Sequence, residues 1–173
     1  MNRIGECREW QISYRELEAK DFEGLFKLAN DVASDSPEAM TVDVSDKNAF
    51  MDIFTKKLSG MNSGNLIDLV AESRGCIIGE CEAVIGGANS IVGILLDKRY
   101  RRSGIGSELL SAMMPKLQKI GVRNLMAEVA GENKGAIRFF AQNGFSLAWS
   151  GKKEVYNQKI NAVWLLRKIQ VEL

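Results

Sequence analysis

A basic turn that contains two glycines, near the middle of the chain, combines residue types that bind phosphate. Apolar residues precede it, and the whole segment consists of Ile94, Leu95, Leu96, Asp97, Lys98, Arg99, Tyr100, Arg101, Arg102, Ser103, Gly104, Ile105, Gly106 and Ser107. At the start of a helix the first backbone N–H groups have no internal partner and lie at the positive end of the helix dipole. Glycines let a ligand approach closely, and arginines add charge. The segment therefore predicts a strand, a turn that binds pyrophosphate, and a helix.

Other phosphate-binding classes do not fit this turn. It has no GxxxxGK[ST] sequence, so it is not a P-loop, and it lacks the third glycine of a GxGxxG dinucleotide site. About thirty residues further along, a second segment reads Asn133-Lys134-Gly135-Ala136-Ile137-Arg138-Phe139-Phe140-Ala141-Gln142-Asn143-Gly144-Phe145. The hexapeptide Arg101 to Gly106 resembles the Q/R-x-x-G-x-G/A signature of the GNAT superfamily of N-acetyltransferases. The second segment resembles the motif N-x-x-A, an aromatic pair and G-F of the same superfamily.

The resemblance implies that acetyl-CoA binds in a V-shaped gap between the fourth and fifth strands. Backbone groups of Ile94, Leu95 and Leu96 would then pair with the pantetheine arm as an added strand does. The turn would hold the pyrophosphate through Arg101, Arg102, Ser103, Gly104, Ile105, Gly106 and Ser107. The second motif would contact the cofactor through Asn133, Ala136, Phe139 and Phe140.

In this family a neutral amine attacks the thioester directly, so the protein must accept a proton and stabilise an oxyanion. The resemblance implies a backbone N–H beside Leu96 as the oxyanion donor. It also favours Glu128 as the base, because the ribosomal-protein-like N-terminal acetyltransferases carry a glutamate in a similar place. Competing carboxylates are Glu80, Glu82 and Asp97.

The chain departs from the family pattern at Phe140, where relatives usually carry a tyrosine that protonates the leaving thiolate. Phenylalanine has no donor. Tyr156, Tyr100 or a water could take that role, or coenzyme A could leave as the thiolate, because a free thiol has a pKa of roughly 8.5.

Several of these residues also have purely structural interpretations. Asn133 suits the N-cap of the following helix, and Glu128 could be an outward-facing strand residue. Phe139 and Phe140 suit a hydrophobic core. Cys81 lies between Glu80 and Glu82, which would raise its thiol pKa, so we assign the cysteines no function.

Composition excludes several classes of function. The 173 residues include no histidine, so histidine-based catalysis is ruled out. The sequence has only three cysteines, without a CxxC pair, so neither a secreted disulfide framework nor a metal site is expected. A formal net charge of +1 gives no global attraction to nucleic acid or to an anionic membrane. The longest uncharged run is too short and too polar to cross a bilayer, and the charged N-terminus is unlike a signal peptide. We therefore expect a cytoplasmic protein.

Hydrophobic periodicity predicts the elements that position these residues. The expected order is βααβββαβαββ, an α+β fold with a mixed, mostly antiparallel sheet flanked by helices, in one domain over residues 1–173. Asp21 is a possible N-cap of the first helix. The second helix is expected to start near Ser45 or Asp46 and stop at Gly60. Pro115 predicts a kink or an early break in the third helix.

The sequence thus predicts an N-acetyltransferase that moves an acetyl group from acetyl-CoA to a primary amine, either a peptide N-terminus or a small amine. The peptide is slightly favoured because of Glu128. Two segments, Asp21 to Gly60 and Trp149 to Val163, would build the acceptor site. The alternatives are a non-enzymatic acetyl-CoA-binding regulatory domain and transfer of a longer acyl group. The apolar stretch Ala162 to Leu166 would be an inner strand or part of a homodimer sheet.

Overall fold

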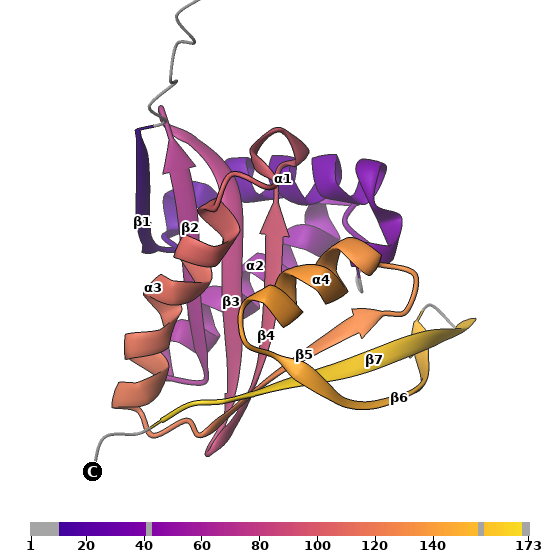
Figure 1. Ribbon diagram of the computed structural model, residues 1–173. Coiled ribbons are helices and arrows are strands. Elements are labelled where there is room, and N and C mark those ends of the chain that lie inside the picture. Colours follow the sequence, from indigo (N-terminus) through magenta and orange to yellow (C-terminus); the bar gives the residue numbers. More distant parts are fainter. Residues whose placement is uncertain (1–10, 41–42, 156–157, 171–173) are drawn as a thin grey trace, which may run out of the picture.

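The computed structural model describes residues 11–40, 43–155 and 158–170. Its strands form a single mixed sheet of seven, in the order β1-β2-β3-β4-β5-β7-β6 (Figure 1). The elements along the chain are β1 (Ile12–Glu16), η1 (Ala19–Asp21), α1 (Phe22–Asp35), η2 (Pro37–Ala39), α2 (Lys47–Asn62), β2 (Leu66–Ser73), β3 (Cys76–Gly86), β4 (Asn89–Leu96), η3 (Lys98–Tyr100), α3 (Ile105–Lys119), β5 (Asn124–Ala130), α4 (Lys134–Gln142), β6 (Ser146–Val155) and β7 (Gln158–Lys168), where η marks a short 3-10 helix. The order of the strands and α-helices is the one that the sequence predicts, and the α+β class is confirmed.

Local sequence signals fix most of the element ends. Asp46 caps α2, because its carboxylate accepts hydrogen bonds from the backbone N–H groups of Asn48 and Ala49. Asp21 stands at the N-cap position of α1 but makes no capping bond to that helix. Its side chain instead forms an ion pair with Arg15, with 2.7 Å between Nη1 and Oδ2. This pair ties β1 to the start of α1.

One expected helix end and one expected early break are wrong. Helix α2 continues past Gly60 to Asn62, and a Cβ on Gly60 would lie only 3.1 Å from the Cβ of Leu66. The glycine is therefore needed for close packing rather than for termination. Helix α3 runs through Pro115 to Lys119, so the early break does not occur. Both Pro115 and Ser111 are exposed, so water can bond the Ser111 carbonyl that the proline leaves without a donor.

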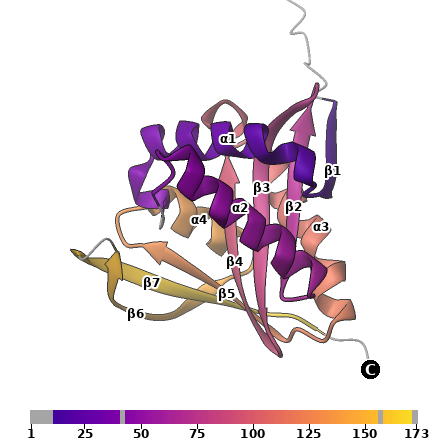
Figure 2. The same ribbon diagram turned by 180° about the vertical axis from the view of Figure 1, so that it is seen from behind.

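Helices cover both faces of the sheet. In Figure 1, α3 and α4 lie in front of the sheet, and in Figure 2, seen from behind, α1 and α2 cross it over β2, β3 and β4. A separate hydrophobic cluster fills each interface. One packs α3 and α4 residues such as Leu109 and Phe140 against Leu125, and the other packs α1 and α2 residues such as Leu25 and Phe54 against Val70.

The parallel pair of strands β4 and β5 stays together over only a short distance. Its register joins Asn89 with Asn124, Ser90 with Leu125 and Ile91 with Met126, and within the described residues no pairing continues beyond that point. The remaining half of β4 is bonded to β3 alone, while β5 continues along β7. A gap therefore opens between β4 and β5 toward their C-terminal ends. Strand β7 is an inner strand, between β5 and β6, as one of the two sequence interpretations predicts.

Candidate active site

A cleft occupies the gap between the separating strands. Its walls come from the η2 region, from β4, β5 and α4, and from the final hairpin, and its lining residues are Glu38, Ala39, Met40, Val92, Gly93, Ile94, Glu128, Val129, Ala130, Asn133, Ala136, Phe140, Lys153, Val155, Ile160 and Ala162. The two segments expected to build an acceptor site both contribute to it. The cleft joins the α4 side of the sheet, with Asn133 and Ala136, to the opposite face, with Glu128 and Lys153.

Glu128 is the carboxylate on the β5 wall of this cleft. Burial alternates along β5, with Leu125, Ala127 and Val129 packed in the core, so Glu128 points to the opposite face of the sheet. Its Oε2 accepts a hydrogen bond from Nε1 of Trp164 at 2.9 Å, and its Oε1 forms an ion pair with Lys153. About a quarter of the side chain is exposed. The carboxylate is therefore held in place by two donors and still open to a ligand in the cleft.

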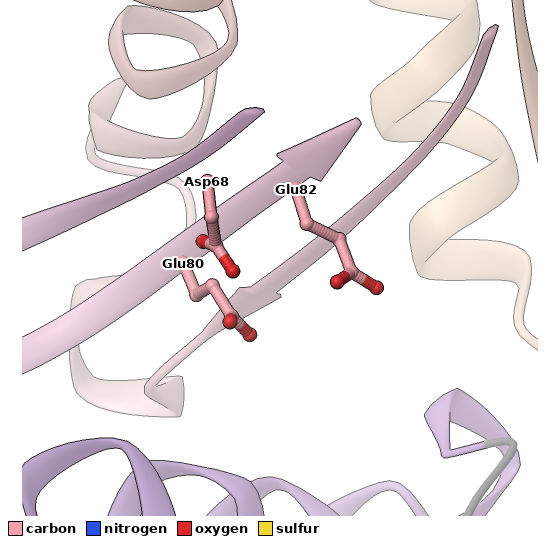
Figure 3. Close-up of side chains that lie close together, drawn as sticks. All are labelled: Asp68, Glu80 and Glu82. Carbon is pink, nitrogen blue, oxygen red and sulfur yellow. The ribbon is translucent and has the colours of Figure 1, made fainter. Parts of the chain in front are cut away.

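The competing carboxylates on β3 belong to a different cluster. Asp68, Glu80 and Glu82 point from β2 and β3 toward one another, with one oxygen of each within 4.8 Å of the others (Figure 3). The ammonium of Lys57, on α2, bonds to all three, at 3.1 Å from Asp68 and 2.9 Å from Glu80. Lys57 thus supplies the positive charge that these carboxylates require, and the four residues form a structural ion cluster.

Titration behaviour follows from the burial of this cluster. Burial and the charge of Glu80 raise the pKa of Asp68 well above its ordinary value, against the opposing effect of Lys57. Burial works to lower the pKa of Lys57, but the charges of Glu80, Asp68 and Glu82 outweigh it and raise that pKa above 10.5. Burial, followed by these carboxylates, also raises the pKa of the Cys81 thiol, as expected from the sequence.

Asp97, the last competing carboxylate, is also engaged. Its Oδ1 accepts a hydrogen bond from the backbone N–H of Arg99 at 2.9 Å, and its Oδ2 pairs with the Arg99 guanidinium at 2.6 Å. These side-chain and backbone bonds hold the pKa of Asp97 below its ordinary value. Asp97 thereby caps η3. Among the candidate bases, Glu128 is the one whose side chain lines the cleft.

The start of α3 has the geometry of an anion cradle. Gly104 is the N-cap, in the left-handed conformation with φ of 90°, and a Cβ there would meet no atom closer than 4.0 Å. The helix then begins with Ile105, whose side chain is buried, and Gly106, whose absent Cβ would lie 3.0 Å from Phe139. The first N–H groups of α3 are thus presented beside a glycine, with Ser107 partly exposed in the first turn.

The arginines of the turn have different positions. Arg101 is engaged with its own chain: its Nε donates to the carbonyl of Leu96 at 3.1 Å, and its Nη1 pairs with Asp35 at 2.7 Å. Arg102 is exposed and has a positive φ of 62°. The hydroxyl of Ser103 donates to the carbonyl of Tyr100. Arg101 thus braces the turn against the end of α1, which leaves Arg102 and the backbone N–H groups facing outward.

Residues of the second motif reach the cleft from α4. Asn133 is the N-cap of α4, with its Oδ1 accepting from the backbone N–H of Ala136 at 2.9 Å, so the capping interpretation is confirmed, and both residues also line the cleft. Phe140 is buried and packs edge-on against Phe139 and Phe145, with ring centroids 5.2 and 5.0 Å apart. Phe139 packs against the start of α3.

A tyrosine that could replace the usual general acid is absent from the described cleft lining. Tyr100 lies in η3, where the Arg99 guanidinium stands over its ring. Tyr156, the other candidate, lies outside the described residues, as does the charged N-terminal segment with Cys7. Within the part of the chain that the structure describes, no helix has both the length and the apolar character needed to cross a membrane.

Lys153 and Trp164 are the site residues that the sequence patterns do not single out. Both belong to the final hairpin, whose involvement was expected only as a segment. The register pairs Glu128 with Trp164 and places Lys153 on the same face of the sheet. Trp164 also stacks on Trp149, with ring centroids 5.3 Å apart. The alternation of side chains along β6 and β7 could have indicated that Lys153 and Trp164 share a face. It could not have indicated that both contact the Glu128 carboxylate.

Comparison with known proteins identifies relatives. Over 59 residues the chain is 36% identical to the [ribosomal protein bS18]-alanine N-acetyltransferase of Escherichia coli strain K12. The matched stretch makes up 34% of this chain and 40% of that protein. The chain thus spans less than half the length of the curated relatives it matches.

Solved structures share the whole fold. One is the acetyltransferase from Salmonella typhimurium that modifies the N-terminal serine of the ribosomal protein L7/L12, with a TM-score of 0.83 and 14% identity over 92% of this chain and 95% of that one. Another is the ribosomal L7/L12 alpha-N-protein acetyltransferase RimL in complex with coenzyme A, with a TM-score of 0.81 and 15% identity over 93% of this chain and 96% of that one.

The sequence model of the Acetyltransferase (GNAT) family matches residues 15–145, a range that includes both the glycine turn and the whole second motif. Strand separation, the cradle at α3 and the cleft therefore coincide with a family match over most of the chain, and the protein is a member of the Acetyltransferase (GNAT) family.

Proposed function

We propose that this protein transfers an acetyl group from acetyl-CoA to a primary amine, with Glu128 as the proton acceptor. The observation that carries the proposal is the cleft itself. It places the outer edge of β4 and the Glu128 carboxylate on facing walls of one opening. A thioester on one wall and an amine on the other would meet there, so positioning supplies much of the rate enhancement.

Acetyl-CoA fits the residues present. The outer edge of β4 is unpaired with β5 after Ile91, so the backbone groups that face outward between Ile94 and Leu96 could pair with a pantetheine arm, beside the Leu96 carbonyl that Arg101 already contacts. Gly104 and the first N–H groups of α3 suit a pyrophosphate, and Arg102 adds an exposed positive charge. Asn133 and Ala136 provide the α4 wall. Bound acetyl-CoA supplies an activated acetyl thioester.

The protein itself must accept the proton that the amine loses and stabilise the oxyanion. Glu128, held by Trp164 and Lys153, accepts the proton that the acceptor amine loses, and a backbone N–H beside Leu96 stabilises the developing oxyanion. The described part of the cleft lining holds no tyrosine, so a water or Tyr156, which lies outside the described residues, would protonate the sulfur, or coenzyme A would leave as the thiolate. This departure is tolerable because a thiol has a pKa of roughly 8.5, and the positive end of a nearby helix lowers it further.

The acceptor class that we propose is a peptide N-terminus. Its support is the carboxylate on β5 together with the likeness to ribosomal-protein N-acetyltransferases. A small amine is the competing acceptor. Comparison of kcat/KM for short peptides with free N-termini, the same peptides with blocked N-termini, and small amines distinguishes the two. Turnover of small amines alone would contradict the peptide assignment.

A second candidate function, acetyl-CoA binding without turnover, is favoured by one observation. Phe140 replaces the expected hydroxyl donor and is buried in the core. Calorimetric titration with acetyl-CoA followed by the amine screen separates the candidates. Binding with turnover supports the enzyme, binding without turnover of any amine supports the regulatory domain, and absence of binding contradicts both.

A further inference from the structure

The cleft contains an amine that belongs to the protein. Among the described residues that line it, Lys153 alone carries a primary amine, and its Nζ is ion-paired with Oε1 of Glu128. Glu128 is the group proposed to accept the proton of the acceptor amine. The lysine therefore stands where an acceptor ammonium would be expected, against the base and in the same opening as Gly93 and Ile94 of β4.

We propose that Lys153 is itself acetylated in cis by bound acetyl-CoA, an inference that rests on the proposed function. Two further features support it. The hydrogen bond from Trp164 holds Oε2 of Glu128, and the other oxygen, Oε1, is the one that pairs with Lys153. The Lys153 side chain is 31% exposed, so it is neither locked in the core nor free in solvent. Cis transfer follows because Lys153 and Glu128 meet within one chain.

The chemistry of this step balances without another reactant. The Lys153 ammonium gives one proton to Glu128, and the neutral Nζ then attacks the thioester carbonyl carbon. An N–C bond forms, the C–S bond breaks, and the sulfur leaves with the electron pair. The second proton lost from Nζ ends on the sulfur, while Glu128 releases its proton to solvent. The products are Nε-acetyllysine and free coenzyme A, with no change in oxidation state.

Acetylation would change the site that performs it. The amide product has no charge, so the ion pair with Glu128 is lost, and the carboxylate keeps only the bond from Trp164. Lys152, the preceding residue, is exposed, and the described partners of the Glu128 carboxylate are Lys153 and Trp164, so Lys152 reports the background chemical acetylation of a solvent-facing lysine. The pair Lys152 and Lys153 thus provides an internal control.

The main experiment incubates the full chain with acetyl-CoA alone and follows both lysines by peptide mass spectrometry. We expect acetylation of Lys153 at least about 100-fold faster than that of Lys152, the scale of general-base catalysis, and a rate constant independent of protein concentration. In Glu128→Gln the Lys153 rate falls to that of Lys152. Equal rates for the two lysines in the wild type, or a Lys153 rate that grows with protein concentration, would overturn the inference.

A second experiment needs no acetyl-CoA. Competitive labelling with trace acetic anhydride measures how available each amine is. We expect Lys153 to be labelled more slowly than Lys152 in the wild type and at a similar rate in Glu128→Gln, because the ion pair is then weakened. Equal labelling of Lys152 and Lys153 in the wild type would contradict the ion pair between Lys153 and Glu128, on which the inference depends.

Failure of the inference and failure of the proposed function give different results. If acetyl-CoA binds and an added amine is acetylated while Lys153 stays unmodified, cis acetylation is wrong and the proposed function stands. If acetyl-CoA does not bind, both are wrong. The variant Gly104→Glu, which disturbs the cradle, should abolish Lys153 acetylation and leave the anhydride labelling of Lys153 as in the wild type.

Discussion

Trp164 donates its indole N–H to the Glu128 carboxylate from the neighbouring strand, with 2.9 Å between Nε1 and Oε2. The two residues are register partners in the pairing of β5 with β7, so the bond is built into the sheet. Hydrogen bonds to a charged group contribute about 1.5–3 kcal/mol, enough to orient a carboxylate. Trp164 is therefore a positioning residue, since it acts through Glu128.

A substitution of Trp164 can distinguish the effect of its hydrogen bond to Glu128 from the effect of its ring packing on Trp149. Trp164→Phe keeps an aromatic ring beside Trp149 but removes the N–H donor, so we expect kcat to fall about tenfold with the KM for acetyl-CoA unchanged. Trp149→Phe, which alters the same stack without touching Glu128, is the matched control. Steady-state kinetics of both variants check the prediction, and equal kcat values for the two would contradict it.

Loss of the base itself should have a larger effect. Glu128→Gln keeps the shape and the bond from Trp164 but cannot accept a proton, so kcat should fall by about 10²–10⁴ while acetyl-CoA affinity is retained. Glu154 is an exposed glutamate on the hairpin of β6 and β7, and the variant Glu154→Gln should behave as the wild type. The check is kinetics together with calorimetry. Unchanged turnover in Glu128→Gln would assign the base elsewhere.

The two ends of α3 offer a paired test of the cradle. Gly104 at the start and Gly121 just past the end both have positive φ, 90° and 80°, so glutamate at either position costs about 1–2 kcal/mol of backbone strain. Only Gly104→Glu places a carboxylate at the proposed pyrophosphate site. We expect it to abolish acetyl-CoA binding in calorimetry, while Gly121→Glu binds as the wild type. Equal affinities would contradict the cradle assignment.

The Lys57 cluster predicts a stability effect that is independent of catalysis. Lys57→Met leaves the buried carboxylates of Asp68 and Glu80 without their cation, so the free energy of unfolding at neutral pH should fall by about 3–5 kcal/mol. Lys56→Met, at an exposed position next to it, should change stability by less than about 0.5 kcal/mol. Urea unfolding of the two variants measures the difference. Similar losses in both would show that the cluster is not stabilising.

The same cluster sets the sign of a pH effect. The folded-state pKa of Asp68 lies well above its ordinary value of 3.8, so the folded state binds more protons than the unfolded state in the interval between the two values. This contribution to stability is fully present below 3.8 and is lost as the pH rises through the folded-state pKa. Asp68→Asn removes that loss. As the pH rises from 3, the difference in unfolding free energy between Asp68→Asn and the wild type should therefore shift in favour of the variant, and a difference that does not change with pH would contradict the assignment.

Local sequence determined the elements and the cofactor motifs. Hydrophobic periodicity and the Asp46 cap act within a few residues of the chain, so they could be identified without tertiary structure. The glycine turn at Gly104 is also local, because a left-handed N-cap and the first N–H groups of a helix belong to one short segment. The family resemblance rests on the same segments.

Tertiary packing overrode two of these local signals. Gly60 has the residue type of a helix end, yet α2 continues past it because the missing side chain lets the helix pack against Leu66. Pro115 interrupts hydrogen bonding but not α3, since the affected residues face water. In each case the environment of the residue, which the sequence does not contain, decided the outcome.

The chemistry of the site depends on which strands become neighbours. The alternation of buried residues along β5 determines that Glu128 points to the face opposite that of Leu125, Ala127 and Val129. It does not determine which side chains Glu128 contacts on that face. Lys153 and Trp164 are 25 and 36 residues away in sequence, and only the order β5-β7-β6 and its register bring them to Glu128. The sequence by itself, through the family resemblance, predicted a carboxylate and a glycine turn close to one gap between strands. The tertiary structure decided which groups hold that carboxylate, because long-range strand pairing is not encoded in the local pattern.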